Sequence, residues 1–244
     1  KLHSTDPRLR RHVYHDSRSK LYAFSTEGLT IQSVVHARHI PILNQGNIGS
    51  CTGNAGIGAL ATDPLFSTLP TALKYPLNES GAVHLYSDAE VIDGNGPFPP
   101  NDNGSCGLSI AKALQSAGII SGYQHTFSLD DALKALTQYP ILVGVSWYDS
   151  MFHPDPDGRV HPMGTISGGH EIMAREIDAP NKRIWFDNSW GRSWGVNGRF
   201  YLTFDDFGSL LGQRGDVVVL TPVTAPTPTP TPIPAPAPVV HTPE

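Results

Sequence analysis

The stretch NQGNIGSCTGNAGIGALA, residues 44 to 61, joins a glycine-containing turn to a run of small residues that begins at a cysteine. The chain of 244 residues has only two cysteines, and Cys51 stands where the turn meets the run. Gly46 and Gly49 allow a tight turn, and the small residues that follow predict a helix buried on all sides. A thiol at the start of a helix lies near free N–H groups and the positive end of the helix dipole. The stretch therefore predicts a reactive cysteine.

A thiol nucleophile also needs a nearby imidazole and donors for the oxyanion formed on the attacked carbonyl. The segment SGGHEIM places His170 at the start of a predicted strand, where Gly169 leaves room in front of the ring. Asn188 follows eighteen residues later and can orient the far nitrogen of the imidazole. Trp190 can cover that hydrogen bond, and Gln45 offers an amide donor six residues before the cysteine.

Predicted helices come first along the chain and predicted strands second, which indicates an α+β protein with two lobes. Hydrophobic spacing predicts helices over residues 51–61, 108–119 and 128–140. Short apolar or alternating segments predict strands over 141–147, 171–177, 183–190, 199–204 and 216–220. A cleft between two lobes is a usual place for a site.

Both ends of the chain differ from the middle in composition. Residues 1–28 are polar, include the basic cluster RLRR, and are expected to form an N-terminal extension on the surface or a short pro-segment. Residues 29–221 are expected to form the folded domain. Residues 222–244 are rich in proline and threonine and predict an extended polyproline II spacer. Such spacers join modules, so we expect a further domain beyond it.

Charge and composition exclude several classes of partner. The net charge of -5 gives no reason to expect nucleic acid or an anionic membrane, and no apolar run approaches the roughly 20 residues that span a bilayer. Two cysteines cannot form a disulfide framework. The sequence implies no metal and no organic cofactor, and we expect a monomeric domain that is extracellular, secreted or associated with a phage.

The motifs NQGNIGSC, GGH and NSWGRSWGVNG together resemble the papain-like cysteine peptidases, over residues 29 to 220. The resemblance implies a helical N-terminal lobe over about 29–125 and an antiparallel, β-barrel-like lobe over about 126–221, with the active site in the cleft between them. It also implies roles for individual residues, which are Cys51 as nucleophile, His170 as general base and acid, Asn188 as orienting group, Gln45 with the Cys51 amide as oxyanion hole, and Trp190 as shield.

The segment NGSCGLSIAKALQSAGI, residues 103 to 119, is similar to the substrate-binding loop and following helix of the same family. The resemblance implies that Gly104 and Ser105 pair with the substrate backbone. It also implies that Cys106 borders the pocket for the second residue before the scissile bond. Glu171 can border the same pocket, where an ionised carboxylate would favour a basic substrate side chain.

Two departures from the family pattern bear on the comparison. Ile48 and Thr52 replace the cysteine and the aromatic residue that flank the nucleophile in many relatives. The missing cysteine is typical of a bacterial or phage branch, in which xylellain-like enzymes are found. His170 follows Cys51 by 119 residues (170 − 51), a little under the roughly 130–150 of the family, and a shortened loop would explain the difference.

The sequence thus predicts a cysteine endopeptidase that hydrolyses peptide bonds of a peptide or protein substrate through a thioester acyl-enzyme. One alternative uses the same site to open an amide of bacterial cell-wall peptide. Another is a non-catalytic, papain-shaped binding module on a proline-rich spacer. A Cys51 sulfur that is sealed inside packing, or that lies well beyond proton-transfer reach of the His170 ring, would leave the enzyme hypotheses without support.

Overall fold

The computed structural model describes residues 4–13 and 17–223. The predicted spacer from residue 224 onward lies outside the described residues. No helix in the described ranges is long and apolar enough to cross a membrane.

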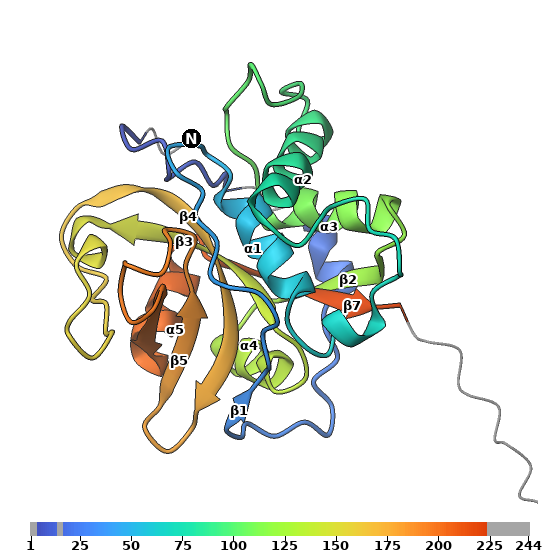
Figure 1. Ribbon diagram of the computed structural model, residues 1–244. Coiled ribbons are helices and arrows are strands. Elements are labelled where there is room, and N and C mark those ends of the chain that lie inside the picture. Colours follow the sequence, from blue (N-terminus) through green and yellow to red (C-terminus); the bar gives the residue numbers. More distant parts are fainter. Residues whose placement is uncertain (1–3, 14–16, 224–244) are drawn as a thin grey trace, which may run out of the picture.

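The helices and strands follow the expected order, with helices concentrated in the first half (Figure 1). The helices are α1 (Cys51–Leu60), α2 (Glu79–Ile92), α3 (Gly107–Ser116), α4 (Leu129–Leu136) and α5 (Phe204–Gly212), with 3-10 turns η1 (Ser17–Tyr22), η2 (Phe66–Thr68) and η3 (Asp149–Phe152). The strands are β1 (Val34–Val35), β2 (Ile120–Thr126), β3 (Ile141–Tyr148), β4 (Ile166–Asp178), β5 (Arg183–Asp187), β6 (Arg199–Thr203) and β7 (Asp216–Pro222).

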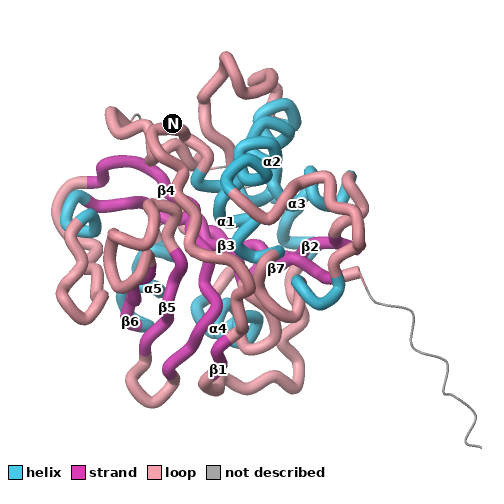
Figure 2. The backbone as a smooth tube through the Cα atoms, viewed as in Figure 1, coloured by secondary structure: helices cyan, strands magenta, loops and turns pink. Residues whose placement is uncertain are grey.

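The strands form one antiparallel sheet with the order β2-β7-β3-β4-β5-β6, and β1 adds to the edge of β4. Among the described residues the end strands β2 and β6 do not pair, so the sheet is not closed. The expected α+β fold is confirmed, whereas its second lobe is an open, strongly curved sheet instead of a barrel (Figure 2).

Two hydrophobic cores lie on opposite faces of the middle strands, and the strand period of two separates them. In β3, Ile141, Val143 and Val145 face a core shared with α4 and α5, whereas Leu142 faces a core shared with α1, α2 and α3. In β7, Val217 and Val218 divide between the two cores in the same way. The run that reads as continuously apolar is therefore a strand buried on both faces.

The small residues of α1 permit close packing, because every residue of this helix is buried. A Cβ atom on Gly53 would lie 2.1 Å from the Ala82 carbonyl oxygen of α2, so only glycine allows the two helices to approach this closely. α4 begins at the expected N-cap, where the Ser128 hydroxyl accepts a hydrogen bond from the Asp131 N–H at 3.1 Å.

The N-terminal residues 4–13, which we call the strap, are mostly part-exposed but anchor two side chains in the interior. Leu9 and Arg11 are buried, with 1% and 3% exposure. The strap runs between β4 and the loop that precedes α3. It therefore occupies the position where the sequence predicts a substrate.

Candidate active site

Cys51 is the first residue of α1 and is completely buried. Burial raises the pKa of its thiol to about 12, and the N–H groups of Glu171, Thr52 and Arg10 offset this only in part. Arg10 belongs to the strap, so the thiol is covered by the strap and is absent from both hydrophobic cores. In this closed form Cys51 is a neutral thiol at neutral pH.

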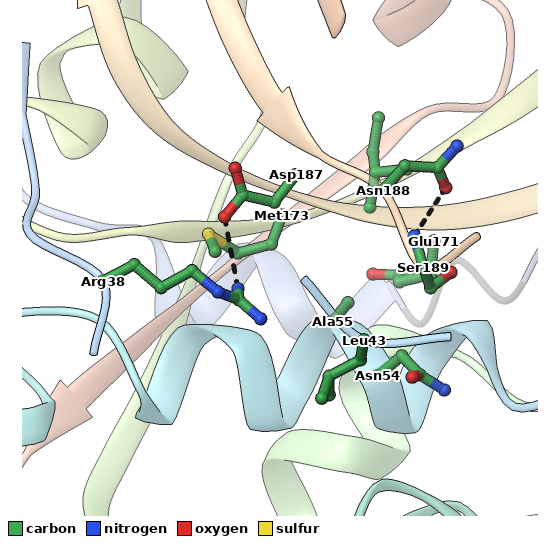
Figure 3. A pocket seen from close by; sticks show the side chains of 10 residues that line it. Arg38, Leu43, Asn54, Ala55, Glu171, Met173, Asp187, Asn188 and Ser189 are labelled. Carbon is green, nitrogen blue, oxygen red and sulfur yellow. Dashed lines mark hydrogen bonds and ion pairs between the residues drawn. The ribbon is translucent and has the colours of Figure 1, made fainter. Parts of the chain in front are cut away.

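His170 and Asn188 form the expected pair, with 2.8 Å between the histidine Nε2 and the asparagine Oδ1. The same Oδ1 accepts a hydrogen bond from the Ser189 N–H at 2.8 Å, which fixes the amide orientation (Figure 3). Because Oδ1 only accepts, Nε2 carries the ring proton and Nδ1 keeps its lone pair. Nδ1 makes no hydrogen bond with any described residue.

Tryptophan rings enclose the imidazole of His170, which is itself buried. Trp190 stacks on it with ring centroids 4.9 Å apart, and Trp147 meets it edge-on at the same distance. Burial is the main reason why the pKa of His170 falls to about 4. The ring is therefore neutral at neutral pH, and Trp190 covers one of its faces.

Gln45 is held by Ser189, whose hydroxyl donates to the glutamine Oε1 at 2.5 Å. The Gln45 Nε2 then points toward the strap, where it donates to the Arg8 carbonyl at 3.3 Å as well as to the Ile48 carbonyl at 2.7 Å. The Arg8 carbonyl is also close enough to the His170 ring to raise its pKa. A peptide carbonyl of the chain itself thus lies against both side chains.

The loop before α3 is held by hydrogen bonds to Tyr86 of α2 and to Asp93, the residue that follows α2. Ser105 donates from its hydroxyl to Asp93 at 2.6 Å, and the Gly104 N–H donates to the Tyr86 hydroxyl at 2.9 Å. Cys106, the N-cap residue of α3, is buried with its sulfur 3.5 Å from a serine hydroxyl. Burial raises the pKa of Cys106, so this thiol is also neutral.

The strap pairs with both walls of the site through its backbone. The Arg11 N–H donates to the Gly169 carbonyl at 3.1 Å, and the His12 N–H donates to the Ser105 carbonyl at 2.7 Å. A Cβ atom on Gly169 would lie 2.6 Å from the Arg11 carbonyl oxygen, and one on Gly104 would lie 1.7 Å from that of Arg10. These glycines leave space that the strap fills.

A buried carboxylate supports the end of the strand that leads to Asn188. Asp187 pairs with Arg38 at 3.2 Å, Arg175 at 2.9 Å and Arg199 at 3.1 Å. Figure 3 shows Arg38 and Asp187 reaching toward one another above α1. Because the next residue is Asn188, this cluster fixes the backbone from which the orienting amide projects.

The structure brings every predicted site residue into one region: Gln45, Cys51, Gly104, Ser105, Cys106, Gly169, His170, Glu171, Asn188 and Trp190. The Cys51 thiol and the His170 ring share no hydrogen bond in this closed form, and the strap contacts both. Ser189, Asp187 and the strap itself were not predicted from the sequence. The basic cluster RLRR was visible, but nothing local indicated its partners.

No family model matches the chain, and no curated protein matches it. Among solved structures, xylellain, a cysteine protease from Xylella fastidiosa, is similar with a TM-score of 0.70 at 17% identity, over 91% of this chain and 98% of that one. Bromelain from Ananas comosus, in complex with the E64 inhibitor, gives 0.54 at 19% identity over 76% and 95%. Digestive procathepsin L 3 of Tenebrio molitor gives 0.58 at 14% identity over 89% and 75%.

These three cysteine proteases share the arrangement of helices and sheet over most of this chain. The identities are too low to carry a function, but the coverage and scores are those of one architecture. The chain has the papain-like, two-lobed α+β fold.

Proposed function

We propose that the chain is a cysteine endopeptidase whose strap holds it in a latent form. The observation that carries the proposal is the common position of a helix-terminal thiol, a histidine–asparagine pair and an oriented glutamine amide. A backbone segment of the chain lies against all of them. A site that accepts an extended peptide beside a thiol and an imidazole has the parts needed for acyl transfer to sulfur.

The reaction follows from the donors and acceptors of the site. His170 Nδ1 accepts the proton of the Cys51 thiol, and the thiolate attacks the substrate carbonyl carbon. Gln45 Nε2 and the Cys51 N–H stabilise the resulting oxyanion. The imidazolium then protonates the leaving amine, which departs and leaves a thioester on Cys51.

Hydrolysis of the thioester completes the cycle. His170 takes a proton from water, and the hydroxide attacks the thioester carbonyl in the same oxyanion site. The carbon–sulfur bond breaks, the carboxylic acid leaves and the thiol is restored. Throughout, Asn188 holds Nε2–H so that Nδ1 faces the reacting atoms.

Latency follows from the protonation states of the closed form. A thiol with a pKa of about 12 beside an imidazole with a pKa of about 4 does not form an ion pair at neutral pH. Both shifts come mainly from burial, to which the strap contributes by covering the site. Departure of the strap would return water and the substrate to the site and bring both pKa values toward their ordinary range.

The direction of the strap explains how it can occupy the site without being cut. Arg8 lies over Trp190, with 4.4 Å from the guanidinium carbon to the ring centroid, whereas His12 pairs with Ser105. If Ser105 binds the acyl side of a substrate, as the family resemblance implies, the strap runs opposite to a substrate. Its carbonyl carbons are then presented to Cys51 in the wrong orientation for attack.

The chain offers a matched pair of variants to test the proposal, because it has two buried thiols. Full-length protein carrying Arg11→Ala, which loosens the strap, is incubated with casein and with an E-64-type reagent, and cleavage and covalent labelling are measured. We expect Cys51→Ala to abolish both, and Cys106→Ala, which keeps the Cys51 thiol, to keep the labelling. Cleavage that persists in Cys51→Ala would refute the peptidase. Release of peptide from purified peptidoglycan without casein cleavage would instead identify a cell-wall amidase.

A further inference from the structure

Arg11 of the strap inserts its side chain into a closed pocket beside the site. The side chain has no exposed surface. Its guanidinium meets Glu171 at 3.6 Å from Nε to the carboxylate oxygen, and Nη2 pairs with Asp216. Nη1 and Nη2 both donate to the Arg214 carbonyl at 3.2 Å. Each of these three partners is an acceptor.

The walls of the pocket fit a flat cation. A Cβ atom on Gly144 of β3 would lie 2.0 Å from the Arg11 Nε and 2.5 Å from its central carbon, so the guanidinium rests against a bare backbone. Arg214 has a φ of 76°, in the left-handed region, and its carbonyl accepts both hydrogen bonds from the guanidinium. Arg is suited to this geometry because its planar fork donates in several directions at once.

The buried acid of the pocket depends on Arg11 for its charge balance. Neither carboxylate oxygen of Glu171 has a hydrogen bond with any described residue, although its side chain is completely buried. Among the charges of the described chain, Arg11 is the one that offsets the effect of burial on the pKa of Glu171. Removal of the strap would leave two carboxylates facing a cavity of arginine shape, which requires a new cation or water.

The pocket is also adjacent to the proposed peptide-binding backbone. Arg11 donates from its own N–H to Gly169, which directly precedes His170, and the residue after it pairs with Ser105. Any peptide that replaced the strap along these two walls would carry a side chain to the same opening. The strap thus acts as an internal ligand, and its side chain in the pocket indicates which substrate side chain the pocket fits.

We infer that Glu171, Asp216 and the Arg214 carbonyl form a subsite for a substrate arginine, which Arg11 occupies in the closed form. The inference rests on the proposed peptidase and specifies its substrate class as peptides with a basic residue near the scissile bond. By the family resemblance this is the second residue on the acyl side. Lysine would bind more weakly, because an ammonium group cannot meet all three acceptors in one plane.

The test uses full-length protein and fluorogenic peptides that differ only at that second residue, which is Arg, Lys, Leu or citrulline. Citrulline keeps the shape of arginine without its charge. We expect kcat/KM for Arg to exceed that for Leu and citrulline by at least about tenfold. Asp216→Asn and Glu171→Gln should each reduce this preference about tenfold, whereas the exposed control Asp205→Asn should not. Equal values for Arg and citrulline would overturn the inference and leave the peptidase standing.

A binding measurement separates failure of the pocket from failure of the peptidase. In full-length Arg11→Ala protein, propylguanidinium should raise the thermal midpoint of unfolding, and propylamine should raise it less. Neither compound should raise the midpoint of the triple variant that also carries Glu171→Gln and Asp216→Asn. If full-length Arg11→Ala protein, in which the strap is loosened, cleaves none of the peptides, the peptidase proposal fails and this shift decides the pocket. Absence of a shift with propylguanidinium would overturn the pocket.

Discussion

Arg11→Ala should open the site without touching a group that reacts. The variant removes a guanidinium that meets two carboxylates and donates twice to a backbone carbonyl. The remaining interactions of the strap are backbone hydrogen bonds, the buried side chain of Leu9, the Arg8 guanidinium over Trp190, and side-chain contacts of Arg10 and His12 with the carbonyls of Asp102 and Asn103. The strap should therefore spend more time away from Cys51.

The size of the effect follows from the hydrogen bonds that the guanidinium makes. A hydrogen bond to a charged group contributes about 1.5–3 kcal/mol net, so removal of the guanidinium should weaken strap closure by at least about 2 kcal/mol. At about 1.4 kcal/mol per factor of ten, the open fraction should rise about 30-fold. In the closed form the Cys51 pKa is about 12 against an ordinary 9.0, so the closed thiol carries about a thousandfold less thiolate than a free one. Alkylation must therefore pass through the open form.

The assay follows alkylation of Cys51 by iodoacetamide at pH 8 with mass spectrometry, which distinguishes the peptides of the two thiols. Arg11→Ala should label about 30-fold faster than wild type, and Arg183→Ala, which changes an arginine far from the strap, should match wild type. Leu9→Ala provides a second way to loosen the strap if Arg11→Ala loses its near-ultraviolet dichroism. A wild-type rate equal to that of a free thiol, or rates within twofold in all variants, would refute the reasoning.

Three further outcomes follow from the site. Asn188→Ala removes the acceptor of the His170 Nε2–H and should lower kcat about 10- to 100-fold with little change in KM; an unchanged kcat would contradict the orienting role. Asp187→Asn leaves three arginines around a neutral amide and should destabilise the fold by about 3–5 kcal/mol in urea unfolding, unlike Asp205→Asn. Between pH 6.5 and 4.5, buried neutral His170 makes stability fall as pH falls, because the unfolded state binds the proton. Glu171 has a pKa raised to about 7, so its folded form binds the proton first and stability rises as pH falls. Glu171→Gln removes this contribution and should make the free energy of unfolding fall more steeply with decreasing pH, by up to about 1.4 kcal/mol per pH unit. Urea midpoints that change in parallel with pH for both proteins would contradict this prediction.

The sequence predicted the helices whose starts are marked by residues next to them. The helix at Cys51 is confirmed within one residue of its expected end, and the helix after Ser128 begins at its cap. α2 was missed although Asn78 caps it by accepting from the Gly81 N–H and its buried residues recur at helical spacing, because Gly81 and Glu90 on the buried face do not have apolar side chains. β2 was missed because much of it faces solvent and its pairing with β7 is nonlocal.

The site could be predicted where spacing along the chain constrains chemistry, as for Cys51 and His170. Asp216 was visible only as the first residue of a strand, since its partner Arg11 lies 205 residues away (216 − 11). Likewise, the strap has few apolar residues that could have predicted its position. Its backbone N–H groups bind carbonyls of β4 and of the loop before α3, which come together only in the folded protein. Long-range pairing of this kind leaves no periodic signal in either segment.

Because the strap is part of the same polypeptide, its closure is a unimolecular event. Dilution cannot release it, and a peptide in solution must compete against an effective concentration that short tethers set on the order of millimolar. Apparent affinities of inhibitors measured on the intact chain would be weakened by the fraction of molecules that remain closed. Cleavage anywhere between the strap and the domain would convert this internal competition into an ordinary bimolecular one, which dilution would then relieve.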